Sequence, residues 1–159
     1  GKLMSIFLGG TTSSNELDDF EEGSWTPVLK DAASGGNTYS GGGNWTTWAN
    51  YTKIGNLVRV YMNGYGLSNS GMTTGNQIFI HSFPFNADGT QCAFVTMAYF
   101  DSVDNTQFGI HVQINNGQNI GRLHKLDDNA SGSPPINWGH IKTNNYFNFQ
   151  FTITYKTNQ

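Results

Sequence analysis

The segment from Asn145 to Lys156, close to the end of the chain, constrains the fold more than any other. Its apolar side chains stand at every second position and alternate with polar ones; they are Phe147, Phe149, Phe151, Ile153 and Tyr155. Successive side chains of a β-strand point to opposite faces of a sheet, so this period of two predicts a strand with one buried and one polar face. Such a strand needs a sheet whose inner face is covered by a second layer.

Seven further segments have the composition of strands, and clusters of Gly, Asn and Ser separate them. They are Trp25–Lys30, Trp45–Ile54, Asn56–Tyr65, Gln77–Ser82, Cys92–Phe100, Phe108–Ile114 and Asn119–Leu126. This spacing, without helical periods between the strands, predicts an all-β fold: an antiparallel β-sandwich of jelly-roll-like type. Cys92–Phe100 is apolar at consecutive positions, so we expect a central strand covered on both faces or a strand that faces another subunit.

The beginning of the chain has a different character, because all three of its glutamates lie there. A Ser-Asn pair followed by acidic residues is typical of a helix start, and the carboxylates interact favourably with the helix dipole. The pattern predicts a short helix over Asn15–Glu22, with Leu17 and Phe20 packed against the rest of the protein. We therefore expect residues 1–23 to form an arm and a short helix, and residues 24–159 to form the sandwich.

Composition excludes several classes of partner. Only 12% of the residues are charged, the formal net charge is −3, and Arg59 and Arg122 are the only arginines. With so few positive charges the sequence predicts no basic surface for binding nucleic acid or an anionic membrane. No apolar run approaches the roughly 18 residues that a membrane-spanning helix needs, so we expect no membrane insertion. Cys92 is the only cysteine, so no internal disulfide forms, and stability must come from packing or oligomerisation.

Neither catalysis nor cofactor binding is indicated by the motifs. The four histidines and the cysteine lack the spacing of a metal site, and Cys92 lies in an apolar run typical of core residues. Two acidic pairs, Asp101 with Asp104 and Asp127 with Asp128, have the residue type needed for glycoside hydrolysis or for a calcium ion. Aspartates also favour turns through local hydrogen bonds, so we predict no enzyme, no cofactor and no metal.

Aromatic side chains in polar loops are the stronger signal for binding. Trp45 and Trp48 follow a run of three glycines, and Trp138 and His140 follow a Pro-Pro turn. A flat ring stacks on the C–H face of a sugar while neighbouring Asn and Asp side chains bind its hydroxyls, so this pattern favours carbohydrate. The candidate ligand-binding residues are Asn37, Tyr39, Trp45, Trp48, Asp127, Asp128, Trp138 and His140. Tryptophans beside strands are also common in cores and subunit interfaces.

Three blocks of the chain resemble a module common at the C-terminus of bacteriophage tail-fibre and tailspike proteins. The first is Leu-Asp-Asp-Phe-Glu-Glu-Gly-Ser-Trp-Thr-Pro-Val-Leu at residues 17–29, and the second is Tyr-Thr-Lys-Ile-Gly-Asn-Leu-Val-Arg-Val at residues 51–60. The third is Phe-Pro-Phe at residues 83–85. Phe20 stands where the module more often has Tyr, and Ser24 where it more often has Thr. The blocks span roughly half of the chain.

This resemblance implies a homotrimer at the distal end of a virion tail fibre or tailspike, joined by its N-terminal arm to an upstream fibre shaft. It implies attachment to a host surface polysaccharide or lipopolysaccharide, with the loops choosing the receptor. The repeated blocks would position strands; the scaffold residues are Trp25, Pro27, Tyr51, Ile54 and Val58. Two alternatives stay open: a trimerisation or capping module without a ligand, and a polysaccharide depolymerase.

Overall fold

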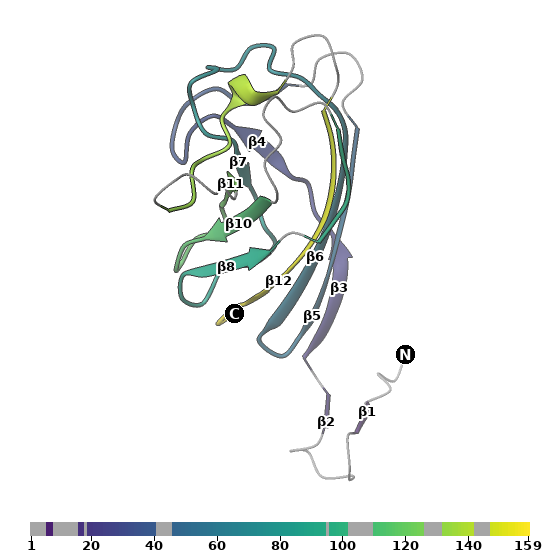
Figure 1. The fold of residues 1–159 in the computed structure, drawn as a ribbon. Coiled ribbons are helices and arrows are strands. Elements are labelled where there is room, and N and C mark those ends of the chain that lie inside the picture. The colour runs from purple at the N-terminus through teal and green to yellow at the C-terminus, as the bar shows by residue number, and fades with distance from the viewer. Residues whose placement is uncertain are drawn as a thin grey trace.

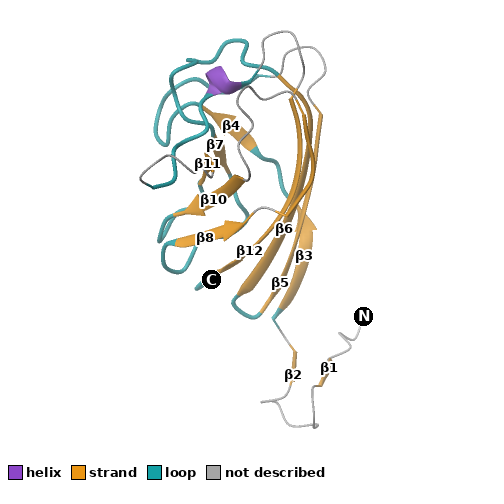
Figure 2. Cartoon of the chain, in the orientation of Figure 1, coloured by secondary structure: helices purple, strands orange, loops and turns teal. Residues whose placement is uncertain are grey.

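In the computed structural model of this chain, the regular structure of the described residues is β-strand, apart from a short 3₁₀-helix (Figures 1 and 2). It describes residues 6–7, 16–17, 19–40, 46–94, 96–101, 110–125, 132–141 and 147–159. The elements are β1 (Ile6–Phe7), β2 (Glu16–Leu17), β3 (Phe20–Ser24), β4 (Val28–Lys30), β5 (Thr46–Ile54), β6 (Leu57–Leu67), β7 (Phe79–His81), β8 (Gln91–Phe94), β9 (Thr96–Asp101), β10 (Ile110–Ile114), β11 (Gly121–Lys125), η2 (Trp138–His140) and β12 (Phe147–Lys156).

Ten of the strands form two five-stranded antiparallel sheets. The order in one sheet is β3-β5-β6-β12-β9, and this sheet contains the longest strands, so we name it the long sheet. The order in the other is β4-β7-β11-β10-β8, which we name the short sheet. The two face each other in Figure 1. The strands β1 and β2 pair with each other in a separate two-stranded sheet.

A hydrophobic core lies between the two sheets, because strands of both sheets turn alternate side chains inward. In the long sheet β6 and β12 supply the largest share; these side chains are Val58, Val60, Met62, Leu67, Phe151, Ile153 and Tyr155. The short sheet supplies Leu29, Ile80, Val112, Ile114 and Leu123. The alternation predicted for the last strand is confirmed from Phe151 to Tyr155, and an all-β sandwich is the architecture that results.

The two-residue turn between β5 and β6 sets their register. Ile54 pairs with Leu57, so only Gly55 and Asn56 connect the strands. Gly55 has a φ of 57°, which is the left-handed conformation that the first position of a type II′ hairpin turn requires. This turn lies at the opposite end of the sandwich from η2 (Figure 2).

The helix predicted over Asn15–Glu22 is wrong. Glu16 and Leu17 belong to β2, and Phe20–Ser24 forms β3, an edge strand paired with β5 through five residues. A two-turn helix has few hydrogen bonds to offset its nucleation cost, whereas β3 completes a ladder on an existing sheet. The strand also crosses the expected boundary between residues 23 and 24, and the Phe20 side chain is half exposed.

The prediction of one central strand over Cys92–Phe100 is also wrong. This stretch forms two strands, β8 at an edge of the short sheet and β9 at an edge of the long sheet. The apolar run is thus divided between two short edge strands, one in each sheet, and does not form one strand in the middle of a sheet.

Candidate functional site

The structure brings four of the eight predicted ligand-binding residues together at the end of the sandwich that carries η2. Two of them are core residues: Trp138 is fully buried and Tyr39 is buried, and their rings contact at a centroid distance of 5.6 Å. Both rings therefore pack inside the protein, at positions where the sequence pattern predicted contact with a ligand. Asn37 is exposed and His140 is partly exposed. Trp45, Asp127 and Asp128 lie outside the described residues.

Hydrogen bonds around Trp138 join three loops into one unit, which we name the loop end: residues 31–40, 68–77 and 132–141. The Trp138 indole Nε1 donates to the Lys30 carbonyl oxygen at 3.2 Å, and its backbone N–H donates to the Asn76 carbonyl oxygen at 2.9 Å. The Gly139 N–H donates to the Thr74 carbonyl oxygen at 2.7 Å. These bonds fix the backbone of the surrounding exposed loop residues.

A buried carboxylate holds the first of these loops to the second. Asp31 accepts hydrogen bonds from the Asn37 backbone N–H at 2.6 Å, the Asn37 Nδ2 at 2.8 Å and the Thr73 N–H at 3.0 Å. Burial by itself raises the pKa of Asp31, but these hydrogen bonds to the charged form outweigh it and hold the pKa below its ordinary value. Asn37, predicted to bind ligand, therefore has its amide engaged within the loop end.

We expect the stability that Asp31 contributes to depend on pH. Because the folded-state pKa is lowered, this contribution is present above the unfolded value of about 3.9 and is lost as the pH falls through the folded value. At pH 7 the variant Asp31→Asn is expected to be less stable than the wild type by about 1.5–3 kcal/mol. Urea unfolding from pH 7 to pH 2 tests this, because the difference should shrink in acid. A difference that is constant over that range would contradict it.

The three blocks of the bacteriophage resemblance meet at one place, where they form a clasp. The Lys53 ammonium, nearly buried, forms an ion pair with Asp19, and the Gly55 N–H donates to the Asp19 carbonyl oxygen at 2.9 Å. The Tyr51 hydroxyl donates to the Glu21 carboxylate, which raises the pKa of that phenol. The first and second blocks are thus the paired strands β3 and β5 and their polar clasp.

The third block contributes aromatic rings that pack against this clasp. The Phe85 ring meets the Tyr51 ring edge-on at 5.5 Å between centroids, and the Lys53 Nζ lies 5.8 Å from the Phe85 centroid. Phe83 stacks on Trp25 at 5.0 Å between centroids. These contacts give the aromatic and charged residues of the three blocks a role in packing.

Gly23 supplies a sharp test of the clasp. A Cβ atom at this position would lie 2.9 Å from Cε1 of Tyr51, whose ring is held by Glu21 and Phe85. We expect Gly23→Ala to lower the free energy of unfolding by about 1–3 kcal/mol in urea unfolding. Gly75→Ala is the control, since a Cβ there meets nothing within 4 Å, and equal effects of the two variants would show that the clasp is not tightly packed.

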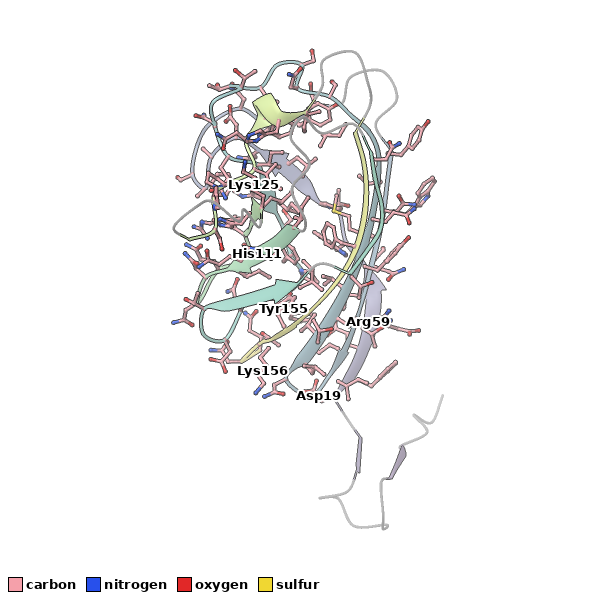
Figure 3. All side chains as sticks on the ribbon, in the orientation of Figure 1. Asp19, Arg59, His111, Lys125, Tyr155 and Lys156 are labelled. Atoms are coloured by element: carbon pink, nitrogen blue, oxygen red, sulfur yellow. The ribbon has the colours of Figure 1, made fainter. Side chains whose placement is uncertain are left out.

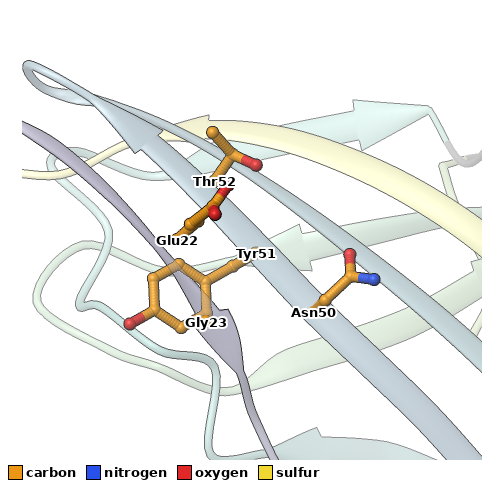
Figure 4. Close-up of a pocket in the computed structure, with 5 residues that line it drawn as sticks. All are labelled: Glu22, Gly23, Asn50, Tyr51 and Thr52. Atoms are coloured by element: carbon orange, nitrogen blue, oxygen red, sulfur yellow. The ribbon is translucent and has the colours of Figure 1, made fainter.

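A shallow depression of about 410 Å³ lies on the long sheet, where β3 meets β5 (Figure 4). Glu22, Gly23, Asn50, Tyr51 and Thr52 line it. Among these, Glu22 and Thr52 are partners across the two strands. Its lining is polar and it is open to solvent, so it is a surface feature of the sheet and not an enclosed active site.

All five large apolar side chains that are exposed in the described part of the chain lie on the outer face of the long sheet. They are Phe20, Trp48, Ile54, Leu57 and Tyr65, with exposed fractions between 46% and 62%. On β6 the alternate residues Val58, Val60 and Met62 point into the core, so Leu57 and Tyr65 point outward. We name this set the apolar face. Arg59 projects from the same side (Figure 3).

The apolar face has two parts separated by polar rows. At the β5–β6 turn Phe20, Ile54 and Leu57 are direct partners across three neighbouring strands. Toward the other end Trp48 pairs with Asn63, which places Trp48 diagonally beside Tyr65. Groups of large exposed apolar side chains on one face are more typical of interaction surfaces than apolar residues that are exposed singly.

Sequence reasoning missed most of this face. Trp48 was among the predicted binding residues and is 62% exposed, but Phe20 was expected to be packed, and Ile54, Leu57 and Tyr65 were not singled out as binding residues. The signal that finds Leu57 and Tyr65 is their parity on β6, where they share a face with Arg59 and Asn63. For Ile54 the signal is its pairing with Leu57 across the hairpin.

Within the described residues, no group of three or more His, Cys, Asp and Glu side chains could hold a metal ion. No helix in that same part of the chain has the length and hydropathy to cross a membrane. Of the two acidic pairs considered for hydrolysis, Asp101 ends β9, and the other three residues lie outside the described ranges. Comparison of the chain with protein-family models gave no match, and comparison with curated protein sequences gave none either.

Proposed function

We propose that this chain is the tip domain of a bacteriophage tail fibre or tailspike, a jelly-roll-like sandwich that associates as a homotrimer and binds a bacterial surface glycan without cleaving it. The proposal rests on the block resemblance, whose residues form the clasp between β3 and β5. In this proposal the N-terminal arm would continue into the fibre shaft, and the domain would lie at the distal end of the virion tail.

The observation that carries the proposal is the apolar face. Five large apolar side chains are exposed on one face of one sheet, in a chain that is otherwise rich in small polar residues. Burying such surface is favourable by about 25 cal/mol per Å², so association of copies through this face stabilises the assembly. Trp48 would then be a subunit contact, in agreement with the second role that tryptophans beside strands commonly have.

The loop end is the surface that we assign to the glycan. Its backbone is held by buried Trp138, Tyr39 and Asp31, and it presents exposed amides and hydroxyls of Thr73, Asn76 and their neighbours. Neutral hydrogen-bonding groups on a preorganised backbone suit sugar hydroxyls, since little conformational freedom is lost on binding. Three copies multiply weak single-site binding through effective concentration.

A panel of immobilised bacterial lipopolysaccharides and capsular polysaccharides tests the function. We expect the intact protein to bind a subset of the panel, and Asn76→Ala to weaken that binding about tenfold, roughly 1.4 kcal/mol, without changing the mass in solution. Asn158→Ala is the matched control, because Asn158 is exposed near the C-terminus, away from the loop end.

The two alternatives give different results in the same assay. If the intact trimer binds none of the polysaccharides in the panel, this result would contradict glycan binding and favour a capping module. Release of soluble oligosaccharide from a bound polysaccharide would contradict the non-enzymatic assignment and favour a depolymerase.

A further inference from the structure

The outer face of the short sheet gathers cationic and imidazole side chains. On β4, β7 and β11 the residues Leu29, Ile80 and Leu123 point into the core, so the alternate residues point outward. These outward residues are Val28, Lys30, Phe79, His81, Arg122 and His124. His111 on β10 also lies on this side (Figure 3). This face therefore holds three of the four histidines and one of the two arginines.

Lys30 and Arg122 flank one aromatic ring. Both are Cα partners of Phe79, Lys30 from β4 and Arg122 from β11, so the three form a row across neighbouring strands. The Arg122 guanidinium lies 5.7 Å from the Phe79 ring centroid, and its Nη1 donates to Gln118 Oε1 at 3.1 Å. The ring and this bond hold the guanidinium in place and leave further N–H groups for a ligand, because a guanidinium has five.

The two cations have no carboxylate partner among the residues that the structure describes. The ion pair that the described residues do form, between Lys53 and Asp19, lies on the long sheet, away from these two cations. Asp31 follows Lys30 directly, but its carboxylate is occupied by the N–H groups of Asn37 and Thr73. Two cations on one face that lack an acidic partner within the described ranges attract an anion from solution.

His81 stands beside these two cations. Its Nε2 donates to the Ala32 carbonyl oxygen at 3.0 Å, since a carbonyl can only accept, and this fixes the ring. Burial lowers the pKa of His81, the hydrogen bond to Ala32 opposes this, and the charges of Lys30 and Arg122 lower the pKa further, so it lies below its ordinary value. A bound anion beside these cations would oppose this lowering and favour a proton on Nδ1.

A stacked pair of imidazoles extends the same face. His111 and His124 lie with their ring centroids 5.1 Å apart and nearly parallel, and burial followed by the neighbouring imidazole lowers the pKa of His111. His124 Nδ1 contacts the Ser133 carbonyl oxygen at 2.8 Å, and its Nε2 lies 3.3 Å from Gln77 Nε2.

We propose that Lys30, His81 and Arg122 form a site for an oxyanion, a phosphate or carboxylate group carried by the bacterial surface polysaccharide. This inference rests on the proposed function and names the chemistry of its ligand. Guanidinium and ammonium groups bind such oxyanions through charge-assisted hydrogen bonds. Because the apolar face belongs to the opposite sheet, copies that associate through that face leave this site open to the host surface.

The test is a titration of the full chain with inorganic phosphate, glucuronate and glucose, followed by backbone amide NMR shifts. We expect saturable shifts at Phe79, His81 and Arg122 with phosphate or glucuronate and none with glucose. A response to phosphate alone identifies phosphorylated glycans as the source, and a response to glucuronate alone identifies uronic acids. Glucuronate does not titrate between pH 7.5 and pH 5.5, so a higher affinity at pH 5.5 reports protonation on the protein.

The double variant Lys30→Gln with Arg122→Gln is expected to weaken oxyanion binding at least about tenfold. If the double variant does not fold, the affinity of the single variant Lys30→Gln is measured in its place and should also be lower than that of the wild type. Arg59→Gln is the matched control, because Arg59 is the other arginine and lies on the long sheet. Equal affinity of the double variant and the wild type, or no saturable shift with either anion, would overturn the proposal. Neutral glycan binding that depends on Asn76 would survive that result, so the two proposals fail separately.

Discussion

Replacing Trp138 by alanine is expected to lower the free energy of unfolding by about 3–5 kcal/mol, the range found when a large aromatic side chain is removed from a core. The side chain is fully buried, contacts the Tyr39 ring and donates its indole N–H to the Lys30 carbonyl oxygen. Its loss leaves a cavity and removes the donor to the Lys30 carbonyl oxygen, while the backbone hydrogen bonds of residues 138 and 139 to residues 76 and 74 remain. Urea unfolding followed by circular dichroism at a fixed protein concentration measures the change.

Trp48→Ala is the matched control, because Trp48 is 62% exposed. At protein concentrations low enough for the copies to dissociate, we expect it to change the free energy of unfolding by less than about 0.5 kcal/mol. At higher concentrations its effect should grow, since it acts through association. A loss below about 1 kcal/mol for Trp138→Ala would contradict the core position of that ring.

Charge on the apolar face is expected to prevent association. In the double variant Ile54→Asp with Leu57→Asp, two adjacent carboxylates replace partnered apolar side chains at the β5–β6 turn. Burying unpaired carboxylates between subunits is strongly unfavourable, so we expect the dissociation constant to rise at least 1,000-fold, about 4 kcal/mol. Sedimentation velocity measures the shift to single chains, and circular dichroism checks that they remain folded.

The control adds the same charge elsewhere. Ser34→Asp with Asn158→Asp places two carboxylates at exposed positions outside the apolar face, and this variant should associate like the wild type. If both double variants dissociate, net charge and not this face governs association. If neither does, the copies meet through another surface.

Much of the sandwich could be predicted because its strands obey the period of two. The core side chains of β12 and β6 stand at alternate positions, and their strands were predicted within a few residues of their observed bounds. The sequence pattern gave a wrong prediction where the same residues are compatible with two structures. Acidic residues before Gly23 are typical of a helix start. Here, however, Asp19 forms an ion pair with Lys53, and Glu21 accepts a hydrogen bond from Tyr51. Both partners lie far away in the sequence, so the residues around Gly23 do not by themselves indicate these contacts.

The binding residues were harder to predict because residue type does not determine burial. Trp48 and Trp138 both stand among small polar residues, yet one is exposed on a sheet face and the other is fully buried. On β5 hydropathy does not identify the inner face, since Lys53 points inward beside Tyr51, whereas Trp48 and Ile54 point outward. The register of β5 with β3 and β6 decides this, and it is known only once the sheet is assembled.

The central claim, that the apolar face joins copies of this chain, is tested most directly by the mass of the wild-type protein in solution. Light scattering coupled to size-exclusion chromatography gives this mass without a reference shape. The account predicts three times the 17.5 kDa of one chain, maintained on dilution to low micromolar concentration. A mass of 17.5 kDa at all concentrations would contradict it, because the five apolar side chains would then remain exposed to water.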